Sequence, residues 1–199
     1  MKNKHYYSEE QDSLFRPKKI HISLKKISFD IYTSGGVFSK NRLDRGTEIL
    51  IENCIIKDEW KVLDLGCGYG VVGIAIKKLY PEAKVVMTDI NKRAVDLAKM
   101  NIKLNGLEGI EAVQGNLYEK VSPGFDTILV NPPQTAGKDI CFEMIKEAKK
   151  YLKTRGILQL VVRSKKGGKQ LSDFMKAVFG NVEVTAKKSG YSVFVSKNV

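Results

Sequence analysis

The chain has 199 residues, 43% of them apolar and 28% charged, a composition typical of a soluble globular protein that is long enough to bury a core. No apolar run approaches the roughly 18 residues that a membrane span requires, and the first residues contain no apolar stretch of the kind found in secretion signals. Three cysteines without a CxxC pair and only two histidines argue against a disulfide framework or a zinc site, so we expect a cytoplasmic protein without metal.

The formal net charge of +12 is distributed unevenly along the chain. Residues 1–60 carry +2 and residues 61–140 carry +1, whereas residues 141–199 carry +9. A solvated, lysine-rich surface accounts for this excess, and so does an anionic partner such as nucleic acid, whose phosphates bind clustered Lys and Arg.

The first 60 residues predict a β-hairpin followed by a helix. Apolar residues alternate with polar ones across residues 18–32, and the alternation is interrupted at Lys25 and Lys26. This period of two is typical of two strands joined by a turn. Residues 34–41, SGGVFSKN, predict a loop, and residues 43–56 predict a helix.

From residue 60 onward the chain alternates between strands and helices. Strands are predicted at residues 61–65, 84–89, 110–114, 126–130 and 157–162, and helices at residues 71–79, 92–105, 139–152 and 170–179. This alternation predicts right-handed crossovers and a doubly wound α/β fold, a mostly parallel sheet with helices on both faces. The last two strands, 181–186 and 191–196, are only four residues apart, too few for a parallel crossover, so we expect the final strand to be antiparallel.

Residues that could bind a ligand stand where the predicted strands end, which is where ligands bind in such sheets. They are Asp64 with the loop Gly66, Cys67, Gly68, Tyr69 and Gly70; Asp89; Gly115, Asn116 and Leu117; and Asn131, Pro132, Pro133 and Gln134. By itself the glycine loop is also consistent with a plain strand-to-helix turn, and with dinucleotide binding because its glycines fit the pattern GxGxxG. The carboxylate inside the first strand and the antiparallel last strand argue against a nicotinamide enzyme.

Together, VLDLGCGYG at 62–70, Asp89, Asn116 and NPP at 131–133 resemble the class I methyltransferases that use S-adenosylmethionine. The segment GVFSKNRLDRGTEIL at 36–50 is similar to the small-domain branch typified by the bacterial small-subunit ribosomal RNA guanine-N2 enzymes. The resemblance implies a seven-stranded sheet of order 3-2-1-4-5-7-6 with strand seven antiparallel. It also implies one domain over 1–199, with 1–59 as an N-terminal extension and 60–199 as the cofactor-binding core.

The resemblance implies S-adenosylmethionine as cofactor and a role for each strand end. The loop of Gly66, Cys67, Gly68 and Gly70 would lie against the amino acid part, with Asp64 supporting it. Asp89 would hold the ribose hydroxyls and Ile90 the adenine, while Asn116, beside Leu117, would accept from the adenine amino group. Asn116 stands where the family often has Asp, and its amide oxygen can still accept. Cys67 is expected to be a small loop residue, because no histidine stands near it in sequence to activate a nucleophile.

Asn131 is interpreted as the catalytic residue, bordering both cofactor and substrate, with Pro132 and Pro133 beside it. An exocyclic amine on a planar ring is a poor nucleophile, because its lone pair is delocalised. The Asn131 side-chain oxygen and the carbonyl of Pro132 can each accept one N–H and turn the lone pair toward the methyl group. The prolines fix φ and lack N–H donors that would compete for the site.

Substrate recognition is expected from four basic residues and two further positions. Arg163, Lys165, Lys166 and Lys169 follow the fifth core strand, beside the NPP turn, where they could bind phosphates; a solvated loop is the alternative. Gln134 stands where relatives carry an aromatic ring that stacks on the base. Gln134 can hydrogen-bond a base edge instead, and Phe38 could supply the ring.

Three functions follow from this reasoning. The leading hypothesis is an N-methyltransferase acting on an exocyclic amine of RNA, namely guanine N2 of ribosomal RNA. The second is a methyltransferase for a protein glutamine amide or another planar nitrogen, which the basic C-terminal region and the GVFS segment disfavour. The third is a non-catalytic RNA-binding protein with a methyltransferase fold.

Overall fold

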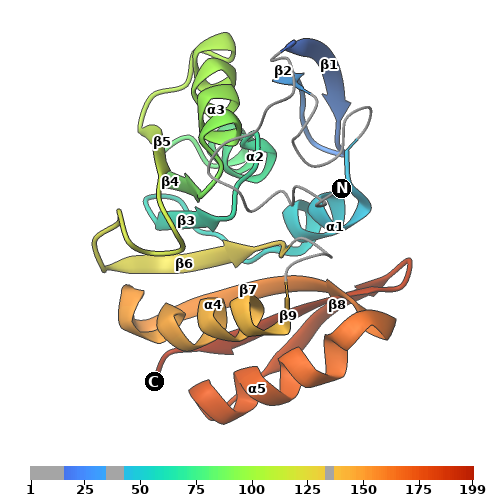
Figure 1. The fold of residues 1–199 in the computed structure, drawn as a ribbon, viewed down its shortest axis with the longest axis vertical. Coiled ribbons are helices and arrows are strands. Elements are labelled where there is room, and N and C mark those ends of the chain that lie inside the picture. The colour runs from blue at the N-terminus through green and yellow to red at the C-terminus, as the bar shows by residue number, and fades with distance from the viewer. Residues whose placement is uncertain (1–15, 35–42, 133–136) are drawn as a thin grey trace, which may run out of the picture.

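The structure, a computed structural model, describes residues 16–34, 43–132 and 137–199, without the side chain of Lys166. Its elements follow the expected order along the chain (Figure 1). They are β1 (Lys18–Ser23), β2 (Ser28–Thr33), α1 (Arg45–Asn53), β3 (Lys61–Leu65), α2 (Val71–Leu79), β4 (Lys84–Asp89), α3 (Lys92–Leu104), β5 (Ile110–Gln114), β6 (Phe125–Val130), α4 (Lys138–Tyr151), β7 (Leu152–Arg163), the π-helical turn η1 (Ser164–Gly168), α5 (Lys169–Phe179), β8 (Glu183–Lys188) and β9 (Tyr191–Lys197).

The seven core strands form one sheet in the order β5-β4-β3-β6-β7-β9-β8. Strands β5, β4, β3, β6 and β7 pair in parallel, and β9 pairs antiparallel with both β7 and β8. Counted among the core strands alone, this is the order 3-2-1-4-5-7-6 with strand seven reversed, so the predicted fold class and topology are confirmed.

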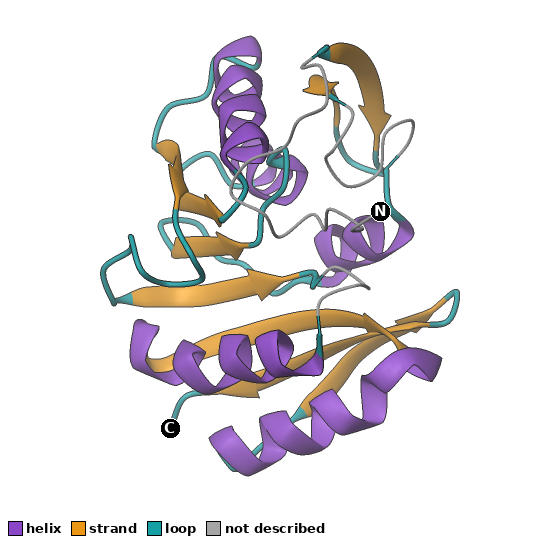
Figure 2. Ribbon diagram, viewed as in Figure 1, coloured by secondary structure: helices purple, strands orange, loops and turns teal. Residues whose placement is uncertain are grey.

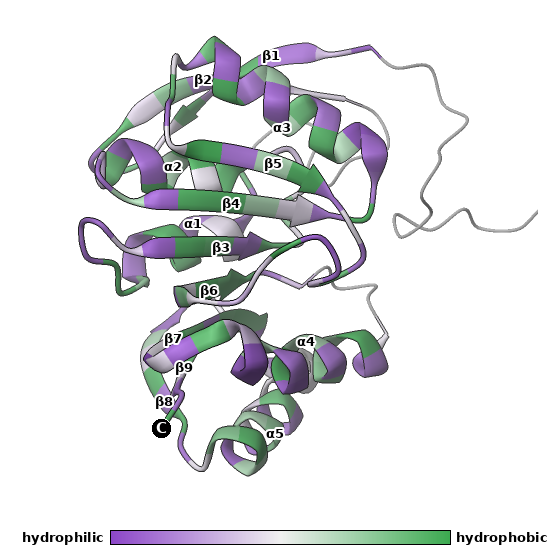
Figure 3. Ribbon diagram, turned by 90° about the vertical axis from the view of Figure 1, so that its left-hand side faces the viewer, coloured by the Kyte–Doolittle hydropathy of each residue, from purple (hydrophilic) through white to green (hydrophobic). Residues whose placement is uncertain are grey.

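Helices cover both faces of this sheet (Figure 2). Helices α1, α2 and α3 contribute to one buried cluster together with the hairpin, and α4 and α5 contribute to the other. Strand β3 shows why the strands are apolar on both sides: Val62 packs into the first cluster, while Leu63 and Leu65 pack into the second. The helices themselves are hydrophobic on one side and hydrophilic on the other, as α3 and α4 illustrate (Figure 3).

Most element boundaries lie within three residues of the sequence prediction, and two differences are larger. Strand β7 begins at Leu152, five residues earlier than expected, and its pairing with β6 shifts register between Phe125 and Thr127. Arg155 has a positive φ of 67°, and a Cβ at Gly156 would lie 3.0 Å from the carbonyl oxygen of Phe125, so the early part of β7 is irregular. The loop expected after β7 is instead η1, which runs directly into α5.

The N-terminal hairpin is attached to the core through α3. Asn101 is fully buried, and its side-chain amide donates to the carbonyl oxygens of both Tyr32 and Tyr69, at 2.9 Å each. Its oxygen accepts from the backbone N–H of Tyr32. One side chain therefore ties β2 to the loop that follows β3. No helix in the described ranges is long and apolar enough to cross a membrane.

Candidate active site

Two cavities lie at the carboxyl ends of the parallel strands. The smaller, about 290 Å³, is lined by the ends of β3, β4 and β5 and by the first turns of α4. The larger, about 600 Å³, is lined by the residues after β6 and β7, by α4, and by Asp44. Leu65 at the end of β3 pairs with Val130 at the end of β6, so Gly66 of the smaller cavity and Asn131 of the larger one follow neighbouring strands.

The loop after β3 needs glycine at three positions. Gly66, Gly68 and Gly70 have φ values of 74°, 56° and 89°, which place them in the left-handed region. The backbone N–H groups of Gly66 and Cys67 both donate to the carbonyl oxygen of Thr88, at 2.8 and 2.9 Å. These bonds hold the loop against the end of β4, which is the edge where the smaller cavity opens.

Two buried carboxylates fix this loop through backbone donors. Asp64 accepts from the N–H of Gly73 at 2.9 Å, which anchors the first turn of α2. Asp89 accepts from the N–H groups of Gly68 at 2.8 Å and Asn91 at 2.9 Å. Burial raises the pKa of Asp64 to about 7; the hydrogen bond from Gly73 opposes this rise, and the charge of Asp89 adds to it.

This pair of carboxylates fits the expected cofactor. S-adenosylmethionine carries a sulfonium and an ammonium group, and a cationic ligand would relieve the repulsion between Asp64 and Asp89. Among the described residues, no group of three His, Cys, Asp or Glu side chains could hold a metal ion instead. Asp89 also lines the smaller cavity, where its acceptor-only carboxylate suits the hydroxyl groups of a ribose.

The remaining cofactor candidates line the same cavity. Ile90, Asn116 and Leu117 are among its wall residues, as expected. Leu117 has a positive φ of 49°, a conformation that costs a non-glycine residue about 1–3 kcal/mol and is found preferentially at ligand sites. Three wall residues that sequence reasoning did not assign to the site come from α4: Ile140, Glu143 and Met144. The apolar periodicity of this helix indicated its packing face and gave no sign of a ligand.

Cys67 has no feature of a nucleophile. Its side chain is buried, and burial raises the pKa of the thiol well above its ordinary value, with the charges of Asp64 and Asp89 adding to the effect. The thiolate is therefore disfavoured, and the thiol sulfur lies 3.5 Å from the carbonyl oxygen of Gly68.

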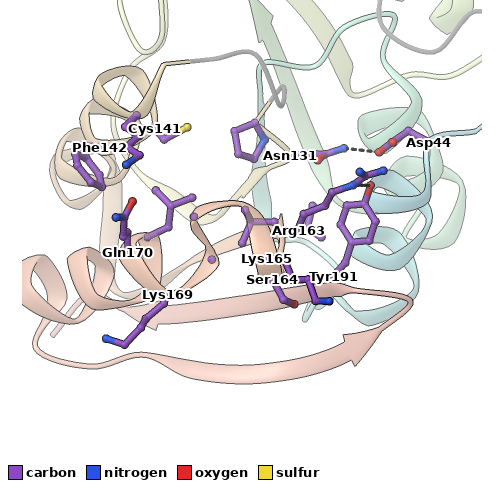
Figure 4. A pocket seen from close by; sticks show the side chains of 17 residues that line it. Asp44, Asn131, Cys141, Phe142, Arg163, Ser164, Lys165, Lys169, Gln170 and Tyr191 are labelled. Atoms are coloured by element: carbon purple, nitrogen blue, oxygen red, sulfur yellow. Dashed lines mark hydrogen bonds between the residues drawn. The ribbon is translucent and has the colours of Figure 1, made fainter.

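Asn131 is held at one end of the larger cavity by two side chains at the start of α1, and Figure 4 shows its contact with one of them, Asp44. Its Nδ2 donates to Oδ2 of Asp44 at 3.2 Å and to Oγ1 of Thr47 at 2.9 Å. Asp44 is also the N-cap of α1, accepting from the N–H of Thr47 at 3.0 Å. Pro132 lines the cavity beside Asn131. Sequence reasoning missed Asp44 and Thr47 as site residues; their only signal was their place in the segment at 36–50.

Arg163 stands near the same end of the cavity and is oriented by Tyr191. Its Nε donates to the Tyr191 hydroxyl at 2.8 Å, and the guanidinium carbon lies 5.4 Å from the ring centre. This hydrogen bond raises the pKa of Arg163, and the negative charge of Asp44 contributes to the rise. Arg163 and Tyr191 are paired across β7 and β9, so the pairing of these two strands is what brings Tyr191 next to Arg163.

The remaining predicted catalytic and substrate-binding residues divide into two groups. Lys165 and Lys169 line the larger cavity, and Lys169 also forms an ion pair with Asp173 at 2.7 Å. Phe38, Pro133, Gln134 and the side chain of Lys166 lie outside the described residues.

The far end of the larger cavity is formed by Cys141, Phe142 and Gln170 (Figure 4). Phe142 packs against Phe174 with ring centres 4.4 Å apart. Phe142 and Tyr191 are the aromatic side chains among the described residues that line this cavity. The two rings lie at opposite ends of the cavity, Phe142 on α4 and Tyr191 on β9, and neither was predicted as a site residue.

Several known proteins are similar to this chain in sequence or in fold. The chain is 32% identical over 200 residues to the uncharacterized protein YbxB of Bacillus subtilis (strain 168), covering 99% of this chain and all of that one. It is 36% identical over 182 residues to ribosomal RNA small subunit methyltransferase C of Haemophilus influenzae, covering 89% of this chain and 53% of the relative. The chain thus spans about half the length of that methyltransferase.

The fold is also that of a solved structure, the 16S rRNA N2 G1207 methyltransferase of T. thermophilus in complex with AdoMet and guanosine. The TM-score is 0.81 at 22% identity, covering 94% of this chain and 51% of that one. The family model described as methyltransferase small domain matches residues 28–195. The chain therefore belongs to the methyltransferase small domain family, a family of S-adenosylmethionine-dependent methyltransferases.

Proposed function

We propose that this protein transfers a methyl group from S-adenosylmethionine to an exocyclic amine of RNA, with guanine N2 of ribosomal RNA as the target. The observation that carries the proposal is the position of Asn131. It follows β6, which pairs with β3, and it lines the larger cavity, which has a basic rim. The similarity to ribosomal RNA small subunit methyltransferase C supports the choice of substrate.

The chain's own residues perform two tasks in this reaction. Bound S-adenosylmethionine supplies an electrophilic methyl group, which Asp89, Asn116 and the glycine loop place at the ends of β3, β4 and β5. Asn131 Oδ1 and the carbonyl oxygen of Pro132 accept the two N–H groups of the amine and direct its lone pair. Orientation of this kind can lower a barrier by up to about 7–11 kcal/mol. The nitrogen releases a proton to solvent after it has gained the methyl group, so no strong base is required.

The larger cavity has the composition that a nucleotide requires. Arg163, Lys165 and Lys169 supply cationic groups that can bind phosphate, while Tyr191 supplies aromatic surface near Asn131 and Phe142 supplies it at the far end of the cavity. Of these residues, Arg163 is the best oriented, because its hydrogen bond to Tyr191 fixes the guanidinium near Asn131. Positive charge beside the reacting group is expected for an RNA substrate and brings no benefit to a neutral glutamine amide.

Methyl transfer can be tested with labelled S-adenosylmethionine and small-subunit ribosomal RNA stripped of its proteins. We expect label in the RNA, and nucleoside digestion should recover it as N2-methylguanosine. Label on another exocyclic amine would correct the target base. Label in a glutamine-containing peptide but not in RNA would replace the proposal with the protein-amide reaction. Cofactor binding without transfer to either would contradict it.

A further inference from the structure

We infer that Asp44 and Thr47 are positioning residues that fix the side-chain amide of Asn131 in one orientation, with its oxygen available to the substrate. The inference rests on the proposed catalytic role of Asn131. It concerns the polar contact between the start of α1 and the end of β6, two segments that are more than 80 residues apart in the chain.

The polarity of the contact follows from the chemistry of the three groups. An asparagine amide has a donor end and an acceptor end of nearly equal size, and its neighbours decide which way it points. A carboxylate can only accept, so Oδ2 of Asp44, 3.2 Å away, requires the nitrogen of Asn131 on its side. A rotated amide would bring two oxygens together at this distance. Figure 4 shows the nitrogen of Asn131 directed at Asp44 and its oxygen turned away from it.

The hydroxyl group of Thr47 favours the same orientation of the Asn131 amide. Its Oγ1 lies 3.4 Å from Oδ2 of Asp44, so its hydrogen faces the carboxylate, and a lone pair remains to accept from Asn131 at 2.9 Å. Both hydrogens of the Asn131 amide then have acceptors. Asp44 itself cannot turn freely, because the same Oδ2 caps α1 by accepting from the N–H of Thr47 at 3.0 Å.

Packing leaves little room for another arrangement. A Cβ at Gly46 would lie 3.0 Å from Asp44 Oδ2, 3.1 Å from Tyr191 Cε1 and 3.2 Å from Asn131 Oδ1. Helix α1, the end of β6 and the start of β9 therefore meet at a residue that has no side chain. The consequence for catalysis is that the acceptor oxygen of Asn131 is set before the substrate arrives, which is what orientation of a weak nucleophile requires.

A spectroscopic test reads the orientation in the protein alone. In ¹⁵N-labelled protein, the two side-chain amide hydrogens of Asn131, identified by their loss in Asn131→Ala, should show nuclear Overhauser contacts to Thr47. Thr47→Val should shift these resonances and speed their exchange with water, whereas Thr47→Ser should restore them. Amide hydrogens without contact to Thr47, or unmoved by Thr47→Val, would overturn the inference.

A kinetic test uses single-turnover methyl transfer to the stripped ribosomal RNA. Asp44→Ser keeps an N-cap but introduces a hydroxyl that accepts either amide orientation, so we expect a rate about tenfold to a hundredfold lower. Thr47→Val should lower the rate about tenfold with unchanged S-adenosylmethionine affinity, and Thr47→Ser should recover most of it. Asn53→Ala is the matched control, because it removes a 2.7 Å bond to the backbone elsewhere in α1. It should lower the melting temperature and leave the rate unchanged.

The variants also separate this inference from the proposed function. In the Asn131→Ala background, Asp44→Ser should cause no further loss, because residues that act through one group are not additive. A full additional loss there, or wild-type rates for both Asp44→Ser and Thr47→Val, would overturn the positioning role. Wild-type turnover by Asn131→Ala would instead contradict the proposed catalytic residue. Absence of transfer by the wild type would contradict the substrate and leave the spectroscopic test decisive.

Discussion

The two sides of the proposed active site are held by different kinds of contact. On the cofactor side, Asp64 and Asp89 accept from backbone N–H groups in the segments that directly follow β3 and β4. On the substrate side, Asn131 and Arg163 are fixed by side chains from distant segments, Asp44 and Tyr191 among them. The cofactor side therefore depends on the backbone path after β3 and β4, whereas the substrate side depends on how α1, β6, β7 and β9 assemble.

This difference means that substitutions should separate cofactor binding from methyl transfer. A change on the cofactor side should weaken S-adenosylmethionine binding and leave RNA affinity intact. A change on the substrate side should do the reverse, or should lower turnover while both affinities remain. Four substitutions test this separation.

The largest effect on cofactor affinity is expected for Asp89→Asn. An asparagine places an NH₂ group against one of the two backbone donors, Gly68 or Asn91, and also removes a charge that favours the cationic ligand. We expect S-adenosylmethionine affinity, measured by calorimetry, to fall about tenfold to a hundredfold, since each 1.4 kcal/mol is a factor of ten. Asp96→Asn on the exposed face of α3 is the matched control. Equal losses in both variants would contradict a specific role for Asp89.

Gly46→Ala should lower turnover on the substrate side without weakening the fold. Alanine favours helix over glycine by about 0.5–1 kcal/mol, but its Cβ would press on Asp44, Tyr191 and Asn131 at 3.0–3.2 Å. We expect a melting temperature near that of the wild type and a turnover about tenfold lower, because small displacements of reacting groups are costly. If Gly46→Ala has the wild-type melting temperature and also the wild-type turnover, the contacts of Gly46 with these three side chains do not control the position of Asn131.

Lys165→Glu should weaken RNA binding at the rim of the larger cavity. Removing one phosphate contact lowers the slope of log affinity against log salt by about one. The slope can be measured by fluorescence anisotropy with a labelled RNA fragment. Lys84→Glu makes the same charge change at the amino end of β4, the opposite edge of the sheet, and should leave the slope nearly unchanged. The same change of slope in both variants would identify a general charge effect.

The smallest effect is expected for Asp64→Asn, and it depends on pH. The folded pKa of Asp64, about 7, lies above its ordinary value of 3.8, so the folded state binds the proton more tightly than the unfolded state does. The resulting stability is present below about pH 4 and is lost as the pH rises through about 7. Without cofactor, Asp64→Asn should therefore melt higher than the wild type at pH 8, by about 2–4 °C per kcal/mol, with a smaller difference at pH 5. If the melting temperatures of the variant and the wild type change in parallel with pH, Asp64 does not ionise with a raised pKa.

The cofactor side was predictable from sequence because its signals are local. Glycines at positive φ, such as Gly66 and Gly70, and a carboxylate at the end of a strand, such as Asp89, reflect backbone geometry that one segment determines. The regular alternation predicted a mostly parallel sheet, and the short connection before β9 predicted its antiparallel strand; the strand order itself was implied by the resemblance to class I methyltransferases.

The substrate side was only partly predictable, because its contacts are made in space. Asn131 and Arg163 could be placed at strand ends, but their partners could not be named. Asp44 lay inside the helix predicted at 43–56, where nothing in the sequence marks it as the N-cap, and Tyr191 reaches Arg163 only through the antiparallel register of β7 and β9. Phe142, at the far end of the larger cavity, belongs to a helix whose apolar pattern indicates packing alone.

The most direct test of the account is to measure cofactor binding and single-turnover methyl transfer for Asn131→Ala beside the wild type. Asn131 lines the larger cavity and is expected to orient the amine, while Asp89 and the glycine loop are expected to hold the cofactor. We expect S-adenosylmethionine affinity within about twofold of the wild type and a transfer rate lower by about a hundredfold or more. A variant that methylates ribosomal RNA at the wild-type rate would contradict the account.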